Sequence, residues 1–194
     1  MSREKILAAL KQNQPEVSSL PAGLLFEPEA YPDLVRKFRL TAEGIGSTVY
    51  EVNDFSEIPP LLISVFSGVN RIVSMAKELV SAHIPAFKWD EDPHTYADVD
   101  VAIFKPVFGV AENSSLWITE DLMGVRALPF ITQHIVMLVD KKTMVPDMHA
   151  AYEKIGDADY GFGSFIAGPS KTADIEQSLV LGAHGPRSMT IFLY

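Results

Sequence analysis

The feature that most constrains the fold is the way short β-rich runs alternate with helical patterns along the chain. Residues 133–140, QHIVMLVD, are mostly apolar and rich in β-branched side chains, and they predict a strand. Further segments predict strands, with a hairpin in the fourth, at residues 47–52, 71–74, 99–104, 109–118, 163–167 and 189–194. Helices and strands alternate early and strands dominate later, which indicates an α/β fold with a mostly parallel sheet and some antiparallel pairs.

Helical spacing of apolar residues predicts the remaining elements. Ser2 is a suitable N-cap for a short amphipathic helix that carries Ile6, Leu7 and Leu10. Pro59 and Pro60 fit a helix only in its first turn. Further helices are predicted at residues 29–44, 54–66, 77–81, 146–155 and 172–179.

Length and composition limit the number of domains that the chain can form. A chain of 194 residues with 47% hydrophobic side chains can bury a sizeable core. We expect an N-terminal helix and linker over residues 1–20, followed by a single α/β domain over residues 21–194.

Charge and residue types exclude several classes of protein. The net charge of −9 and the absence of a Lys/Arg run argue against nucleic-acid binding. The chain has no cysteine, so it has no thiolate ligand for an iron–sulfur cluster or zinc. No window approaches about 18 uninterrupted apolar residues, so we expect no membrane span and a cytoplasmic setting in a bacterial-type cell.

The stretch GPSKTADIE, residues 168–176, predicts a strand end, a tight turn and the start of a helix. Gly168 permits the sharp turn, and Ser170 or Thr172 can cap the helix. One reading is a capped helix whose own acids, Asp174 and Glu176, complement its dipole. The other is a ligand pocket at a strand end. There the ligand would contact Gly168, Ser170, Lys171, Thr172 and Asp174.

Three other residues have both a functional and a structural reading. Glu112, in GVAENSSLWI, could be a general base or nucleophile, or a turn acid that accepts hydrogen bonds from Ser114 and Ser115. His184 lies in a turn between two small residues, where its imidazole could reach a ligand or have no special role. His134, inside the apolar run, is read as a core or rim histidine.

Patterns for metals and nucleotides are weak or absent. The acidic loop 90–94 is read as a solvated loop rather than a cation site, and no HExxH pattern occurs. The glycines of 43–46 precede a strand instead of following one, and there is no GxxxxGK[ST] motif. We therefore predict no metal and no bound cofactor for this chain.

The order of the motifs GVAENSSL, LPFITQHIVMLV, GPSKTADIE and LGAHGPR resembles the lactate-utilisation protein C family, also called the LUD-domain family. The resemblance covers roughly residues 98–194. This chain has Lys171 where the family usually has Arg, and Asn113 and Ser114 where it usually has Thr and Gly.

The resemblance implies a three-layer α/β/α fold like that of the ribose-phosphate isomerase, glucosamine-phosphate deaminase and CoA-transferase superfamily. It also implies a role in oxidising L-lactate to pyruvate beside iron–sulfur partner proteins, with Glu112 and His184 as candidate catalytic residues. In one hypothesis the chain is a non-redox component of that system. In the other it is a stand-alone enzyme that acts on a small phosphorylated, acyl or folate-like substrate. A small hydroxy-acid or sugar-like ligand fits the predicted pocket.

Overall fold

A computed structural model describes residues 2–19, 31–81, 84, 87–90, 92–172 and 180–194. The α-helices are α1 (Arg3–Gln12), α2 (Leu34–Gly44), α3 (Ile58–Val65), α4 (Glu120–Met123), α5 (Leu128–Ile131) and α6 (Met148–Ile155). The strands are β1 (Thr48–Glu51), β2 (Ile72–Ser74), β3 (Val101–Phe104), β4 (Phe108–Gly109), β5 (Leu116–Thr119), β6 (His134–Val139), β7 (Gly163–Ile166) and β8 (Ser188–Leu193).

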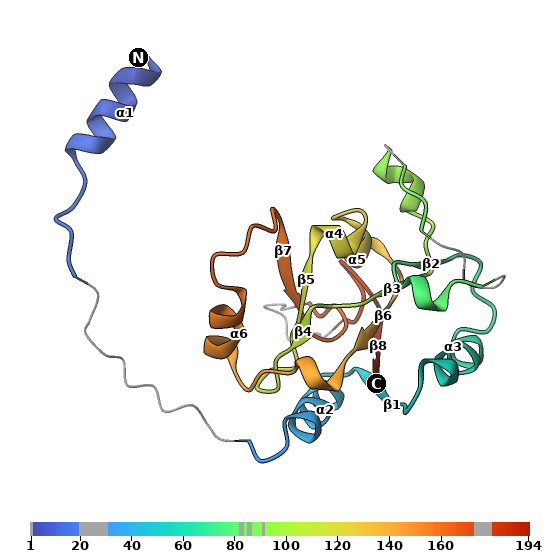
Figure 1. Cartoon of the computed structure of the whole chain (residues 1–194). Helices are drawn as coiled ribbons and strands as arrows, with labels where there is room; N and C mark the ends of the chain where they lie inside the picture. The colour runs from blue at the N-terminus through green and yellow to red at the C-terminus, as the bar shows by residue number, and fades with distance from the viewer. Residues whose placement is uncertain (1, 20–30, 82–83, 85–86, 91, 173–179) are drawn as a thin grey trace.

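The strands form two sheets. The larger sheet has the order β1-β8-β6-β3-β2, and all of its neighbouring strands are parallel (Figure 1). The smaller sheet, β4-β5-β7, is antiparallel. The predicted α/β fold with a mostly parallel central sheet is confirmed. The antiparallel strands form a sheet of their own instead of joining the parallel one.

Side chains of the central strands alternate between two cores. Val101 and Ile103 of β3 face the core that contains Ile58 and Leu62 of α3. Ala102 and Phe104 face the opposite core. These β3 residues are fully buried, and burying a Val or Ile side chain is worth roughly 1.5–3 kcal/mol. The strict alternation therefore fixes which face of the parallel sheet receives each covering layer.

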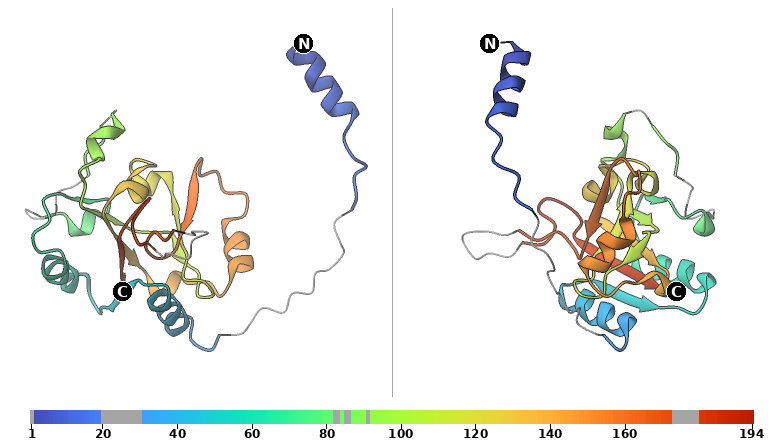
Figure 2. Two further views of the ribbon diagram at one scale, coloured as in Figure 1. Left: turned by 180° about the vertical axis from the view of Figure 1, so that it is seen from behind. Right: turned by 60° about the vertical axis from the view of Figure 1, so that its left-hand side comes forward.

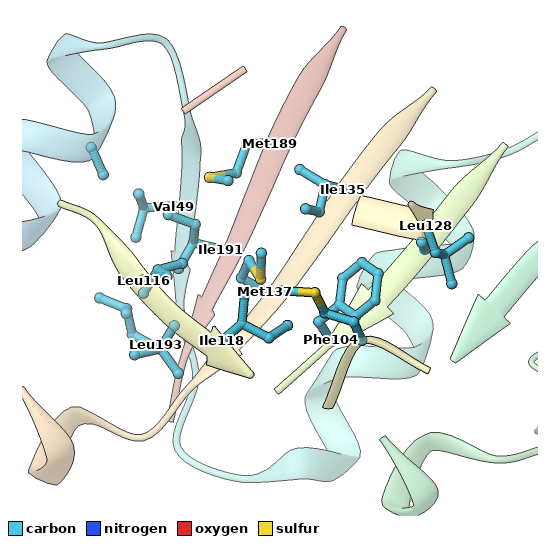
Figure 3. Packing of buried hydrophobic residues seen from close by; sticks show 14 of the residues in the cluster. Val49, Phe104, Leu116, Ile118, Leu128, Ile135, Met137, Met189, Ile191 and Leu193 are labelled. Carbon is cyan, nitrogen blue, oxygen red and sulfur yellow. The ribbon is translucent and has the colours of Figure 1, made fainter. Parts of the chain in front are cut away.

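The antiparallel sheet covers the face of the parallel sheet that α3 leaves free. Leu116 and Ile118 of β5 point toward Met137 of β6 and Ile191 of β8 (Figure 3). Helix α2 adds Phe38 and Ala42 to the same core. Helix α6 packs on the outer side of the antiparallel sheet (Figure 2), where its Ala151 and Ile155 join a third cluster with Phe108, Val110, Trp117 and Val145.

Two predicted helices begin later than the sequence pattern indicated. Helix α2 starts at Leu34 rather than at residue 29, because Asp33 is the N-cap and its Oδ1 accepts the N–H of Arg36 at 2.9 Å. Pro32 also disfavours helical geometry in the residue before it. Helix α6 starts at Met148, since Asp147 Oδ1 accepts the N–H of Ala150 at 2.8 Å. Residues 31–33 and residues 146–147 therefore precede their helices, and the last residue of each range is the N-cap.

Helix α1 forms as predicted, with Ser2 Oγ accepting the N–H of Lys5 at 3.4 Å. It buries none of its residues, and Ile6, Leu7 and Leu10 are exposed. Figures 1 and 2 draw it apart from the two sheets. The division of the chain at residue 20 stays a prediction.

Candidate functional site

The predicted turn after β7 is present, and backbone geometry fixes its course. Gly168 has φ +68°, which an L side chain adopts with strain. A Cβ at Gly168 would lie 3.0 Å from Ile45 Cδ1, so the turn lies against the segment between α2 and β1. Both the conformation and the limited space therefore favour glycine at this position.

The segment after this turn pairs with the segment that precedes β8. The N–H of Ser170 donates to the carbonyl of Pro186 at 2.8 Å, and the N–H of Gly182 donates to the carbonyl of Ser170 at 3.0 Å. Lys171 and Leu181 form an antiparallel bridge. Residues 168–172 and 180–186 therefore form one paired loop.

This loop brings most of the predicted ligand-binding residues together. His184 is exposed in it, and a Cβ on the adjacent Gly185 would lie 3.1 Å from Ser170 Cβ. The hydroxyl of Thr172 accepts the N–H of Val180 at 3.0 Å. Asp174, Glu176 and all but the first residue of the helix predicted at 172–179 lie outside the described residues.

Glu112 lies in the turn between β4 and β5, and a helix start holds its carboxylate. Its Oε2 accepts the N–H of Met148, the first residue of α6, at 3.1 Å. Its own N–H donates to the carbonyl of Pro146 at 2.9 Å. The sequence suggested that Glu112 accepts a hydrogen bond from Ser115. In the structure, Asn113 Oδ1 accepts the N–H of Ser115 at 3.0 Å instead. The structural role of Glu112 therefore involves α6 rather than its own turn.

The two predicted parts of the pocket lie at the same end of the antiparallel sheet. Leu116 pairs with Ile166, so the turn that contains Glu112 and the turn that contains Gly168 both flank this end. Convergence of Glu112 and His184 on one ligand stays a prediction.

The paired loop lies at an unexpected edge of the parallel sheet. Gly168 contacts the segment before β1, and the N–H of Arg187, just before β8, donates to the carbonyl of Gln133, just before β6, at 2.8 Å. These are amino ends of parallel strands. In open α/β sheets, ligands usually bind at the opposite, carboxyl edge. That rule does not apply here, because β7 belongs to the antiparallel sheet.

His134 lies at the same amino edge and is half-buried, in agreement with the prediction of a rim histidine. Its Nδ1 lies 2.8 Å from Ser188 Oγ, and its ring centroid is 5.5 Å from that of Phe66. Burial lowers the pKa of His134 below its ordinary value of 6.5, and the positive charge of Arg187 lowers it further. This environment therefore disfavours the protonated imidazole relative to a solvent-exposed histidine.

The acidic loop is organised by its own hydrogen bonds. Asp92 Oδ1 accepts the backbone N–H of His94 at 2.9 Å, and the pKa of Asp92 is lowered chiefly by this bond. Within the described residues, no three His, Asp or Glu side chains lie close enough to hold a metal ion. Among the residues that the structure describes, no helix is long and apolar enough to cross a membrane.

A cleft that the sequence did not reveal lies at the carboxyl edge of the parallel sheet. It has a volume of about 440 Å³ and is lined by Asp33, Val35, Arg36, Arg39, Glu51 and Lys141. Glu51 ends β1, and Lys141 follows β6 after one residue. Arg36 and Arg39 have the spacing of an ordinary solvated helix face, so no local signal separates them from structural surface charges.

A second cleft of about 430 Å³ lies near the carboxyl end of β2. It is lined by Met75, Phe87, Trp89, Glu120, Asp121, Gly124 and Arg126. Arg126 forms an ion pair with Glu120 there. A Cβ at Gly124, which has φ +72°, would lie 2.8 Å from Met75 Sδ, so glycine permits the close approach of this wall.

Comparison with known sequences gives a consistent set of relatives. The model of the family described as LUD domain matches residues 75–194. A protein named lactate utilization protein C from Oceanobacillus iheyensis is 28% identical over 135 residues, which are 63% of this chain and 56% of that protein. Its namesake from an Exiguobacterium strain is 26% identical over 189 residues, or 88% of this chain and 82% of that protein. Another from Bacillus pumilus is 34% identical, over 41% of this chain and only 35% of its own length.

A solved structure supports the fold. The crystal structure of a DUF162 family protein from Deinococcus radiodurans superposes with a TM-score of 0.64 and covers 82% of this chain and 95% of that one. The two sequences are 15% identical, so this likeness concerns the fold alone.

Proposed function

Because the chain belongs to the LUD-domain family, we propose that it takes part in lactate utilisation, as the non-redox component of a system that oxidises L-lactate to pyruvate. The observation that carries this proposal is the family match, joined by relatives that are named lactate utilization protein C.

The proposed reaction needs an electron acceptor. Oxidation of L-lactate to pyruvate removes two electrons and two protons, because one C–H bond breaks at the carbon that bears the hydroxyl and the O–H bond of that hydroxyl breaks as well. This chain has no cysteine, so it has no thiolate to hold an iron–sulfur cluster. We propose that iron–sulfur partner proteins accept the electrons, and that this chain binds no cofactor.

The paired loop supports a contact role for this chain. Gly168, Ser170, Lys171, Thr172 and His184 are gathered on residues 168–172 and 180–186, and they offer hydroxyl, ammonium and imidazole groups at one edge. Such groups can form hydrogen bonds to a polar ligand or to a partner surface. We propose that these residues contact the partner protein that presents the ligand.

Deletion of the gene in its host tests the proposal. We expect growth on L-lactate as sole carbon source to be lost, growth on glucose to be kept, and a plasmid copy to restore growth. The tagged chain should co-purify with an iron–sulfur protein and be colourless by itself. Unimpaired growth on L-lactate would refute the role. Turnover of a phosphorylated or acyl substrate by the isolated chain would favour the stand-alone enzyme instead.

A further inference from the structure

We propose that the carboxyl-edge cleft, lined by Asp33, Val35, Arg36, Arg39, Glu51 and Lys141, binds a small carboxylate. The cleft lies across strands that are distant in sequence but close in the sheet. Glu51 ends β1 and Lys141 follows β6, and both strands pair with β8. Helix α2 closes the side of the cleft with its first two turns. Carboxyl ends of parallel strands are the usual place for ligands in open α/β sheets.

The charges of the cleft favour an anion. Three basic side chains and two acidic ones line it, although the chain as a whole has a net charge of −9. Lys141 Nζ lies 3.3 Å from Glu51 Oε1, and Arg39 Nε lies 2.9 Å from Glu43 Oε1. Arg36 is exposed, and its guanidinium forms no ion pair with the described residues. A planar guanidinium of this kind suits bidentate recognition of a carboxylate.

The start of α2 lies beside the cleft. Asp33 Oδ1 accepts the N–H of Arg36, so the carboxylate of this N-cap residue already complements the first turn of the helix. The attraction for an anion therefore comes from the basic side chains that line the cleft, Arg36 and Lys141 among them.

The lining of the cleft suits a short acid. The volume of about 440 Å³ accommodates such a ligand together with water. Val35 is half-buried and offers an apolar wall for a methyl group. The Glu51 carboxylate, 47% exposed, can accept a hydrogen bond from a hydroxyl group. Resting on the proposed role in lactate utilisation, we assign the ligand as a short 2-hydroxy acid, with its carboxylate on Arg36 and its hydroxyl on Glu51.

Calorimetric titration of the full-length chain tests this assignment. L-lactate, acetate and inorganic phosphate are titrated separately into the wild-type chain and into Arg36→Gln, Lys141→Gln and Lys142→Gln. Lys142 is the matched control, because it is exposed, carries the same charge as Lys141 and does not line the cleft. We expect L-lactate to bind more tightly than acetate or phosphate. Arg36→Gln should weaken binding about 10-fold or more, and Lys142→Gln less than about 2-fold.

Several outcomes would overturn the inference. They are no binding of L-lactate by the wild-type chain, equal weakening by Lys142→Gln, or tighter binding of phosphate than of L-lactate. Thermal melts of each variant show whether the fold is intact, and Glu51→Gln should weaken L-lactate more than acetate. The result is separable from the growth experiment. Lost growth on L-lactate without L-lactate binding refutes this site alone, while binding without a growth defect refutes the proposed role.

Discussion

The imidazole Nδ1 of His134 lies 2.8 Å from the hydroxyl oxygen of Ser188, across the β6–β8 pair at the amino edge of the parallel sheet. Burial and the nearby Arg187 lower the pKa of His134 below 6.5. As the pH falls below 6.5, His134 therefore binds a proton more readily in the unfolded chain than in the folded chain. The stability that this group contributes is therefore complete above pH 6.5 and is lost as the pH falls toward the lowered folded pKa.

The predicted loss of stability at low pH can be measured. His134→Gln should flatten the decrease in unfolding free energy between pH 6.5 and the folded pKa, because the group that takes up a proton on unfolding is gone. Urea unfolding midpoints at closely spaced pH values measure the slope. His184→Gln is the control, since it removes an exposed imidazole of the paired loop. A variant slope equal to that of the wild type would contradict the assignment to His134.

Local sequence patterns predicted most elements because alternation and helical spacing are local properties. The β6 residues Val136 and Leu138 face one core while Ile135 and Met137 face the other, as a strand buried on both faces requires. Short elements such as α4, with four residues, leave no periodic signal and were not predicted.

The edges and clefts depend on pairings that no local pattern contains. Nothing in residues 163–166 distinguishes a strand of the parallel sheet from one of the antiparallel sheet, so the sequence predicted the turn at Gly168 but not its position at the amino edge of the parallel sheet. Arg36 and Lys141 line one cleft only because β1 and β6 both pair with β8. The order of the strands in the sheet therefore decides which residues share an edge or a cleft, and local sequence patterns do not contain this order.

Ser47 provides a prediction about stability. Its side chain is 7% exposed, and its Oγ has no hydrogen-bond partner in the described residues. Replacing an unsatisfied buried hydroxyl with a methyl hydrogen removes a desolvation cost of about 1–3 kcal/mol. Ser47→Ala should therefore raise the melting temperature.

Ser74 is the matched control for Ser47. It is 2% exposed, and its Oγ donates to the carbonyl of Ala76 at 3.0 Å and accepts the N–H of Ala76 at 3.2 Å. Ser74→Ala should lower the melting temperature, because the N–H of Ala76 loses an acceptor. Thermal melts that move both variants in the same direction would count against the assigned hydrogen bonding.

Gly168 provides a test of the turn after β7. Gly168→Ala should destabilise the fold by about 1–2 kcal/mol for the left-handed conformation alone, and by more because its Cβ would lie 3.0 Å from Ile45 Cδ1. Gly68→Ala separates the two causes, since Gly68 has φ +89° with no atom within 4 Å of the added Cβ. Gly44→Ala has neither constraint and should be neutral or stabilising. Denaturant unfolding should give the order Gly168, Gly68, Gly44 from most to least destabilised.

Glu112 provides the last prediction, in which its structural and catalytic readings diverge. Its carboxylate accepts the N–H of Met148 at the start of α6, where a negative charge is worth about 0.3–1 kcal/mol. Glu112→Gln keeps an acceptor oxygen and removes the charge, so we expect a stability loss of about that size. Glu153→Gln, near the other end of α6, removes an exposed acid from the negative end of the dipole and should be neutral or slightly stabilising.

Growth on L-lactate separates the two readings of Glu112. Since its carboxylate is already bonded to the start of α6, we expect Glu112→Gln to support growth in proportion to the folded protein that remains, as measured by its abundance in the cell. A catalytic carboxylate gives a different result, because a charge that takes or gives a proton cannot be replaced by an amide. Loss of growth at wild-type abundance, with Glu153→Gln unaffected, would establish Glu112 as a functional residue and contradict the structural role.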